Sequence, residues 1–389
     1  MLARITALPF FVLLMGIGSL AMLVPAGHAV ATDSFAVARS FFYSGVLFFL
    51  LTALIAVAMN GYTPRRAARS HLITLLGAYI ALPLMLAVPF YEAHGRTVFF
   101  DAWFEMVSDF TTTGSTLYDS PWRLNASLHL WRALVGWLGG LFIWITAVAI
   151  LAPMNIGGFE VRSATRPTVA QGLTQIFRVA DTSERLARFT AQLTPIYAGL
   201  TGALWVGLIV AGDTPFVALC HAMATLSTSG ISPIGGLYWA DGGLAGEILI
   251  FCFMIFAVSR LTFSRDALGH EKGSLWQDPE IRMAAALIVI VPTFLFIRHF
   301  VGSIEENRID GAYAGLKALW GGVFTTMSFL TTTGFESRAW MTVTDWSELS
   351  SPGLVLIGLS LIGGGIATTA GGVKLLRVYA LYRHSEREM

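Results

Sequence analysis

Three short stretches of threonine or serine that end in glycine are the residues of this chain best suited to binding an ion. They are Phe110–Ser115, Ala224–Ile231 and Ser328–Phe335. Backbone carbonyl groups in such a stretch can replace the water around a cation, and glycine reaches backbone angles that other residues avoid. One copy alone is weak evidence, because small residues also let membrane helices pack closely. Three copies at similar intervals predict an internal repeat with a shared role.

Each stretch ends a segment too short to cross a bilayer, and that segment lies between longer apolar runs. In the first copy, Phe99–Phe110 lies between Leu72–Phe90 and Leu128–Leu151. The other two copies have the same order: Phe189–Val210, Phe216–Thr228 and Gly243–Ala257, then Met283–His299, Ala312–Thr332 and Pro352–Ile362. Irregular backbone is tolerated at membrane depth only where it is buried in protein or lines a water-filled path. The pattern therefore predicts three re-entrant pore loops, numbered loop 1 to loop 3 in chain order.

The composition is that of a membrane protein. Of the 389 residues, 55% are hydrophobic and 13% charged, and the mean hydropathy is +0.67. Apolar runs of about 20 residues, the length that spans a hydrocarbon core, recur along the chain. Two such runs, Ile5–Val24 and Phe41–Met59, precede the first repeat. The first could pass for a signal peptide, but its apolar stretch is longer than usual, which favours a retained helix.

The predicted fold class is therefore an all-α polytopic membrane protein. Repeated helix–pore loop–helix units surround a central pore, and two extra transmembrane helices precede them. No nucleophile–base pair or ligand cluster indicates an enzyme, and nothing indicates nucleic-acid binding or a covalent cofactor.

Basic residues give the orientation. They concentrate in segments expected on one side of the membrane: Arg65–Arg69, Arg162–Arg188, Arg260–Arg282 and Lys374–Arg387. Because cytoplasmic loops carry an excess of arginine and lysine, all three pore loops are expected to open to the outside. The stretch Arg162–Arg188 also has apolar residues at helical spacing. It is expected either to lie on the inner membrane surface or to dock a partner protein.

Polar residues on the short segments allow further expectations. Asp101, Glu105 and Asp109 lie four residues apart, so a helix would place them on one face at the outer mouth. They would either focus the field and raise the local cation concentration or merely keep the outer surface of the segment wet. His221 is expected to pack behind loop 2 as a satisfied polar residue rather than to relay protons.

These features together resemble the Trk/Ktr/HKT superfamily of potassium transporters, and most closely the membrane subunit of the bacterial Trk uptake system. The matching stretches are Phe110–Thr116, His221–Ile231, Thr331–Phe335 and Ile362–Lys374. The resemblance implies that loop carbonyls coordinate dehydrated potassium, the transported substrate. By position, the filter residues would be Thr112, Thr113, Gly114, Thr228, Ser229, Gly230, Thr332, Thr333 and Gly334. The resemblance also implies a homodimer in the cell inner membrane, seated on cytosolic nucleotide-binding regulatory subunits.

The stretch Ile362–Lys374 is not expected to be a fourth filter loop, because no short helix precedes it and basic residues follow it. It resembles the glycine-rich intramembrane loop that gates transport in the family. The gate residues would be Gly363, Gly364, Gly365, Ala367, Thr368, Thr369, Gly371, Gly372 and Lys374. A run of glycine, alanine and threonine cannot hold a stiff helix, and Lys374 near the pore would oppose cation passage. The alternative is a merely kinked packing helix.

Two features depart from the family. Its members have four repeats, whereas this chain shows three, and Asp109 stands where the family tends to have glycine, which bears on local ion affinity. The expected function is potassium uptake through a central pore with a carbonyl-lined filter and an intramembrane gate. The alternative is a non-conducting scaffold, or a partial subunit or piece that needs another chain to complete the pore.

The expected organisation has five parts. They are a two-helix extension (1–64), repeat 1 (65–160), a cytoplasmic amphipathic connector (161–188), repeat 2 (189–265), and repeat 3 with the gating loop and a cytoplasmic tail (266–389).

Overall fold

The computed structural model describes residues 9–59, 67–154, 182–259, 278–305, 312–340 and 352–388. Within these ranges every regular element is a helix, so the predicted all-α, multi-spanning fold is confirmed. Six of the described helices are long and apolar enough to cross a membrane: Phe10–Ala31, Phe35–Ala58, Leu72–His94, Ala126–Leu151, Glu184–Ala211 and Pro279–Ile297. Shorter apolar helices lie between them, as the repeat pattern predicts.

The N-terminal extension forms a helical hairpin. Helix α2 (Phe10–Ala21) continues through Met22 into α3 (Leu23–Ala31), and α4 (Phe35–Ala58) returns beside both. The first helix therefore ends later than the predicted Val24, and the second begins earlier than Phe41. Helix α3 continues through Pro25 and through Gly27-His28-Ala29, and the His28 ring is held by a 2.8 Å hydrogen bond to Ser127 Oγ.

The first repeat comprises α5 (Ala67–His94), the short α6 (Phe99–Phe110) and α7 (Ala126–Thr146), which ends in a π-helical turn (Ala147–Leu151). A 3₁₀ turn (Pro121–Arg123) lies between loop 1 and α7. Asn125 caps α7 by accepting a 2.9 Å hydrogen bond from Ser127 N, which satisfies one of the free amides at the helix start. The predicted spanning, short, spanning order is present.

The second and third repeats have the same order. Repeat 2 comprises α10 (Thr182–Ala211), α11 (Pro215–Ser227), a 3₁₀ turn (Leu237–Trp239), α12 (Gly243–Met254) and a second 3₁₀ turn (Ile255–Ala257). Repeat 3 comprises α13 (Pro279–Glu305), α14 (Ala312–Leu330) and α16 (Pro352–Ile362), and α17 (Leu375–Glu388) follows. The predicted connector Arg162–Arg188 falls mostly outside the described residues, and from Thr182 the chain is already in α10. Residues 260–277 of the predicted inner loop are also outside them.

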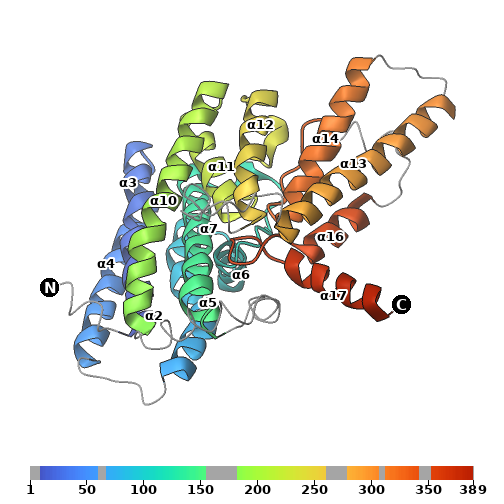
Figure 1. The fold of residues 1–389 in the computed structure, drawn as a ribbon. Helices are drawn as coiled ribbons and strands as arrows, with labels where there is room; N and C mark the ends of the chain where they lie inside the picture. Colours follow the sequence, from blue (N-terminus) through green and yellow to red (C-terminus); the bar gives the residue numbers. More distant parts are fainter. Residues whose placement is uncertain are drawn as a thin grey trace.

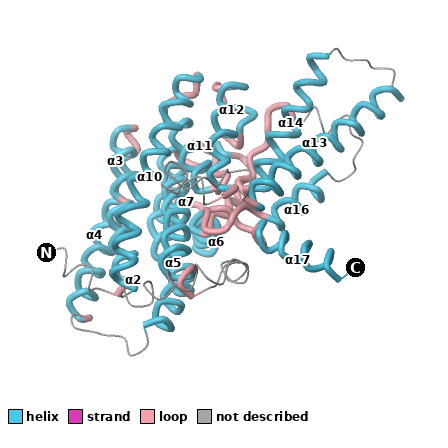
Figure 2. The backbone as a smooth tube through the Cα atoms, viewed as in Figure 1, coloured by secondary structure: helices cyan, strands magenta, loops and turns pink. Residues whose placement is uncertain are grey.

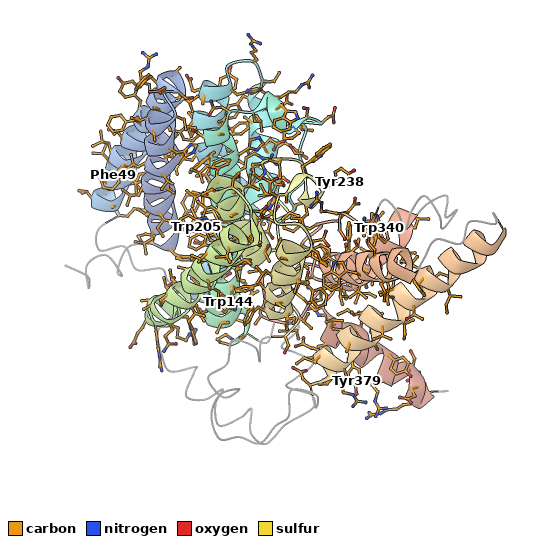
Figure 3. The ribbon with its side chains drawn as sticks, turned by 90° about the horizontal axis from the view of Figure 1, so that it is seen from above. Phe49, Trp144, Trp205, Tyr238, Trp340 and Tyr379 are labelled. Carbon is orange, nitrogen blue, oxygen red and sulfur yellow. The ribbon has the colours of Figure 1, made fainter. Side chains whose placement is uncertain are left out.

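The repeats lie side by side in chain order. Figure 1 shows α3 and α4 on one side, α7, α11 and α12 in the middle, and α13, α14, α16 and α17 on the other side. Viewed from above, Phe49 of α4 and Tyr379 of α17 lie at opposite ends of the molecule (Figure 3). The irregular segments gather between α6, α11 and α14 (Figure 2). Loops from all three repeats therefore meet in the interior.

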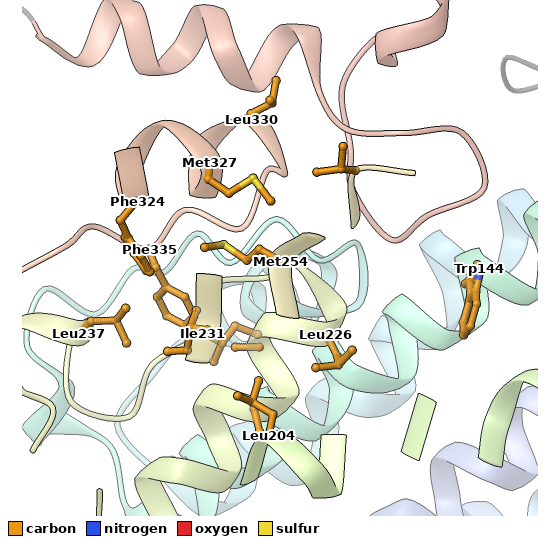
Figure 4. Packing of buried hydrophobic residues seen from close by; sticks show 14 of the residues in the cluster. Trp144, Leu204, Leu226, Ile231, Leu237, Met254, Phe324, Met327, Leu330 and Phe335 are labelled. Carbon is orange, nitrogen blue, oxygen red and sulfur yellow. The ribbon is translucent and has the colours of Figure 1, made fainter. Parts of the chain in front are cut away.

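Apolar side chains fill the interior of this bundle and also lie on its outer faces. Ile231, Met254 and Phe335 pack in the cluster beside the loops (Figure 4) and are at most 2% exposed. On the outer faces, large apolar side chains such as Val57 and Leu361 are 76% and 63% exposed. Such extensive apolar exposure is expected where lipid rather than water covers a helix.

Helix α7 brings the loops close through its glycines. A Cβ on Gly139 would overlap the carbonyl oxygen of Phe110, and one on Gly140 would lie 2.8 Å from Ser227 Cβ. The ends of α6 and α11 therefore pack directly on the backbone of α7. The small-residue face positions the first two loops.

Candidate ion-conduction site

The three loops share one backbone conformation. The second threonine of each, Thr112, Thr228 and Thr332, is left-handed, with φ of 57°, 53° and 56°. The glycine two residues later is also left-handed, at 70°, 63° and 84°. The backbone N–H of the residue between them (Thr113, Ser229 or Thr333) donates to a carbonyl of the preceding short helix, at 2.8–2.9 Å in each loop. A left-handed β-branched residue is uncommon and strained, so three copies at equivalent positions show one built structure used three times.

The hydroxyl groups repeat as well. In each loop, the hydroxyl three residues before the glycine (Thr111, Ser227 or Thr331) donates to the helix carbonyl four residues before itself. The same hydroxyl also forms a hydrogen bond with the hydroxyl of the residue just before the glycine. The pairs are Thr111–Thr113 at 2.8 Å, Ser227–Ser229 at 2.9 Å and Thr331–Thr333 at 2.9 Å. These hydroxyls are engaged within their own loops. Backbone carbonyls are therefore the loop groups best suited to bind a cation.

The loops contact one another in chain order. A Cβ on Gly114 would overlap Ser229 O, and one on Gly230 would overlap Thr333 O. Around Gly334, the described residues place no atom within 4 Å of such a Cβ. All three glycines line one cavity of about 920 Å³. The structure thus brings together the three glycines that the sequence repeat singled out.

The outer wall of this cavity carries charge of both signs. Asp119, Arg132 and Glu336 are among the residues that line it. Partial burial raises the pKa of the Glu336 carboxyl above its ordinary value. The Arg132 guanidinium is itself buried and paired with Glu105 and Asp109, so Asp119 and Glu336 are the acidic residues of the lining without that pairing.

Two of the three acidic residues of α6 do not face water as the sequence interpretations supposed, whereas Asp101 at the start of the helix is only half-buried. Glu105 and Asp109 are fully buried, with Arg132 Nε 2.9 Å from Glu105 Oε2 and 3.4 Å from Asp109 Oδ2. Glu105 Oε1 also accepts hydrogen bonds from Thr116 Oγ1 at 2.9 Å and Leu117 N at 2.6 Å. The shared helical face was predicted correctly, but it faces α7 instead of water. The carboxyl group of Asp109 is thereby paired with Arg132 behind loop 1.

His221 packs behind loop 2 as predicted, but only one of its ring nitrogens, Nε2, has a hydrogen-bond partner among the described residues. It is buried on α11, and its Nε2 lies 2.9 Å from Ser232 Oγ, beyond loop 2. Its ring packs edge-on against Phe335 with centroids 5.5 Å apart. The histidine therefore supports loop 2 and contacts the residue that follows the glycine of loop 3.

The glycine-rich stretch is not helical: α16 ends at Ile362, and the next helix, α17, begins only at Leu375. It is tied to three other parts of the chain. Gly371 N donates to Thr332 Oγ1 at 2.7 Å, Thr369 Oγ1 donates to Leu226 O at 3.1 Å, and Ile366 N donates to Glu280 Oε1 at 2.8 Å. The stretch therefore contacts loop 3 and the end of the second short helix directly.

Glycine is required in this stretch. A Cβ on Gly363 would overlap Gly371 O, and one on Gly365 would overlap Val258 O. The Lys374 ammonium donates to Ala370 O within the same stretch. The chain thus folds back on itself as a compact loop, in place of a kinked helix.

Three functional candidates were missed from the sequence: Arg132, Glu247 and Glu280, each buried. Each is an ionisable residue within or at the start of an apolar helix. Such residues are costly in a membrane and mark functional positions. That rule could have found all three, whereas their partners depend on tertiary contacts.

The architecture defines the class of protein: a multi-pass helical membrane protein whose repeated helix–loop–helix units converge on one cavity. No family model matches the chain. The Trk system potassium uptake protein TrkH of Vibrio parahaemolyticus is 30% identical over 320 residues, which cover 81% of this chain and 61% of the relative. TrkG of Escherichia coli K12 is 27% identical over 354 residues, 88% of this chain and 68% of the relative.

The solved structures agree with this. The crystal structure of the potassium transporter TrkH from Vibrio parahaemolyticus matches with a TM-score of 0.77 at 26% identity, over 100% of this chain and 76% of that chain. The predicted resemblance to the Trk potassium uptake proteins is therefore confirmed in sequence and in fold. These relatives are transporters rather than enzymes, as expected from the motifs. The chain spans about 61% of the length of the first of them.

Proposed function

We propose that this chain takes part in potassium uptake across the inner membrane of the cell, through a central pore. The observation that carries the proposal is the succession of three loops with one backbone conformation, in mutual contact around one cavity. Carbonyl groups presented in this way can take the place of an ion's hydration shell. The potassium ion is the substrate, and no covalent cofactor takes part.

The proposed filter consists of the last three residues of each loop: Thr112, Thr113, Gly114, Thr228, Ser229, Gly230, Thr332, Thr333 and Gly334. The hydroxyls of Thr113, Ser229 and Thr333 bond the hydroxyl two residues earlier in the same loop, which helps to fix the backbone that presents the carbonyls. The membrane potential alone supplies about 2.3 kcal/mol per charge per 100 mV. Channel-like uptake therefore requires no coupling ion.

The proposed gate is the interrupted stretch of the last helix: Gly363, Gly364, Gly365, Ala367, Thr368, Thr369, Gly371, Gly372 and Lys374. Its support is its contact with Thr332 of the filter together with its lack of helical structure. An irregular segment held by a few hydrogen bonds can switch between two arrangements. Release of the Gly371–Thr332 bond would free the stretch from the filter.

The proposed partners are a second copy of the chain and a cytosolic nucleotide-binding regulatory subunit of the Trk type. The support is the similarity to Trk system proteins and the basic residues of α17, which favour the cytoplasmic side. The five-part organisation given above belongs to the same proposal.

Rubidium uptake tests the function. Full-length protein is expressed in cells that lack their own potassium uptake systems, alone and together with a Trk-type regulatory subunit. Rubidium entry above the empty-vector level is expected, with growth restored at low external potassium. Absence of uptake under both conditions, with the protein present in the membrane fraction, would overturn the proposal and favour a non-conducting scaffold.

A further inference from the structure

Helix α12 carries a buried glutamate, Glu247. Glu247 lies in the apolar sequence Gly243–Met254 and is 4% exposed. A carboxylate in such a place is unfavourable unless several donors satisfy it. Its partners therefore show which part of the structure depends on it.

All the described partners of Glu247 belong to the third repeat. Its Oε2 accepts from Trp320 Nε1 at 2.8 Å and from Ser337 Oγ at 2.9 Å, and its Oε1 accepts from Arg338 N at 2.7 Å. Trp320 lies on α14, the helix that leads into loop 3, whereas Ser337 and Arg338 lie where the chain leaves that loop. One carboxylate from repeat 2 thus holds both sides of loop 3.

The first two loops are supported from within their own repeats. Glu105 and His221 each lie nine residues before the glycine of their loop. Each bonds the chain just beyond that glycine: Glu105 binds Leu117 N at 2.6 Å, and His221 binds Ser232 Oγ at 2.9 Å. In these two loops the short helix itself fixes the outer end of the loop.

Loop 3 has only a weak version of this internal support. The residue nine before Gly334 is Thr325, whose Oγ1 accepts from Ser337 N at 3.3 Å. A short hydroxyl has replaced the long side chain present in the other repeats. Glu247 reaches the same segment from the neighbouring helix and accepts two shorter hydrogen bonds there, from Ser337 Oγ and Arg338 N, in addition to the one from Trp320 on α14.

We infer that Glu247 is a positioning residue that fixes loop 3 against repeat 2 and so determines how well the chain discriminates between potassium and sodium. The two repeats also touch at Gly230 and Thr333, within the loops themselves. A shift of loop 3 would change the spacing at this contact, and discrimination depends on the arrangement of the loop carbonyls. The inference rests on the proposed function, since it concerns the selectivity of the same pore.

Three substitutions test it in the full-length protein. Glu247→Gln keeps the size of the side chain but replaces one acceptor oxygen with an NH2 group, which is a donor. That donor would face the donor groups that now bond the carboxylate. Trp320→Phe removes one hydrogen bond and keeps a ring in place, and Ser337→Ala removes another. Glu386→Gln is the matched control, because it neutralises an exposed carboxylate of α17.

The measurement is the inhibition of rubidium uptake by sodium and by potassium in cells lacking other potassium uptake. For Glu247→Gln we expect a several-fold fall in the preference for potassium, with uptake retained at saturating rubidium. We expect smaller falls for Trp320→Phe and Ser337→Ala and none for Glu386→Gln. Unchanged preference in all three site variants, at normal membrane abundance, would overturn the inference.

A second measurement separates this inference from the proposed function. In purified full-length protein, thermal unfolding of Glu247→Gln, Ser337→Ala and the double variant gives the coupling between the two side chains. Non-additive effects are expected if the carboxylate holds loop 3, whether or not the protein transports rubidium. If the wild type shows no uptake but the coupling is present, the proposed function fails and the positioning contact stands. Additive effects would show that Glu247 does not hold the loop.

Discussion

Substitution of Gly139 by alanine should disturb loop 1 without touching a loop residue. A Cβ at this position would overlap the carbonyl oxygen of Phe110 and lie 2.8 Å from its carbonyl carbon and 3.1 Å from its Cα. These are backbone atoms at the end of α6, so no side-chain rotation can relieve the overlap. Because loop 1 begins at the next residue, the displacement passes directly into it.

The magnitude follows from two opposing effects. Alanine favours a helix over glycine by about 1 kcal/mol, whereas an added carbon in a tightly packed interior costs about 1–3 kcal/mol. For Gly139→Ala we expect a net loss of up to about 2 kcal/mol, borne mainly by the contact between α6 and α7. Since 1.4 kcal/mol is a tenfold change in an equilibrium, potassium preference should fall by no more than about thirtyfold.

The matched control is Gly199→Ala on α10. This glycine is also helical, but among the described residues no atom lies within 4 Å of a Cβ built there. The control should keep wild-type rubidium uptake and potassium preference and should unfold at the same or a higher temperature. The assay is sodium inhibition of rubidium uptake, with thermal unfolding of the purified protein in parallel. If Gly139→Ala matches the control in both measurements, the packing of α7 does not position loop 1.

Three further outcomes are expected. Gly114→Ser should lower potassium preference in the same uptake assay, because its side chain would collide with Ser229 O; unchanged ion preference would remove Gly114 from the filter. Burial raises the pKa of Glu336, so this carboxylate takes up a proton at a higher pH than an ordinary glutamate and the cavity loses a negative charge. The KM for rubidium should therefore rise as external pH falls, and Glu336→Gln should show a smaller rise. Thr332→Val removes the acceptor of the Gly371 amide and should raise uptake in the absence of a regulatory subunit, whereas Thr332→Ser should not.

The order of helices could be read from the sequence because it depends on length and apolar content, which are local properties. The predicted run Pro352–Ile362 matches α16 at both ends, and Ala312–Thr332 matches α14 to within two residues. Errors arise at the N-terminus, where the structure extends the first helix to Ala31. Apolar length identifies a span, but it does not locate its ends, and here the helix continues through Pro25, directly after the predicted end.

The meeting of the three loops could be predicted from repetition, whereas their supports could not. Equivalent loops of a repeated unit are expected to lie around one axis, and the structure places Gly114, Gly230 and Gly334 on one cavity. The partner of Glu105 lies on a neighbouring helix, at Arg132, and helical spacing alone cannot identify it. For the same reason, acidic residues on one face were interpreted as facing water.

The strain within the loops explains why such supports exist. Each left-handed threonine, at Thr112, Thr228 and Thr332, costs about 1–3 kcal/mol relative to an ordinary backbone. A single hydrogen bond contributes only about 0.5–1.5 kcal/mol net, so the bonds within one loop only roughly offset its strain. Bonds from outside the loop are needed to make the strained form clearly preferred. Glu105, His221 and Glu247 supply these bonds. A loop that loses its outside bond should therefore relax first at the left-handed threonine, which is the residue that sets the direction of the neighbouring carbonyls.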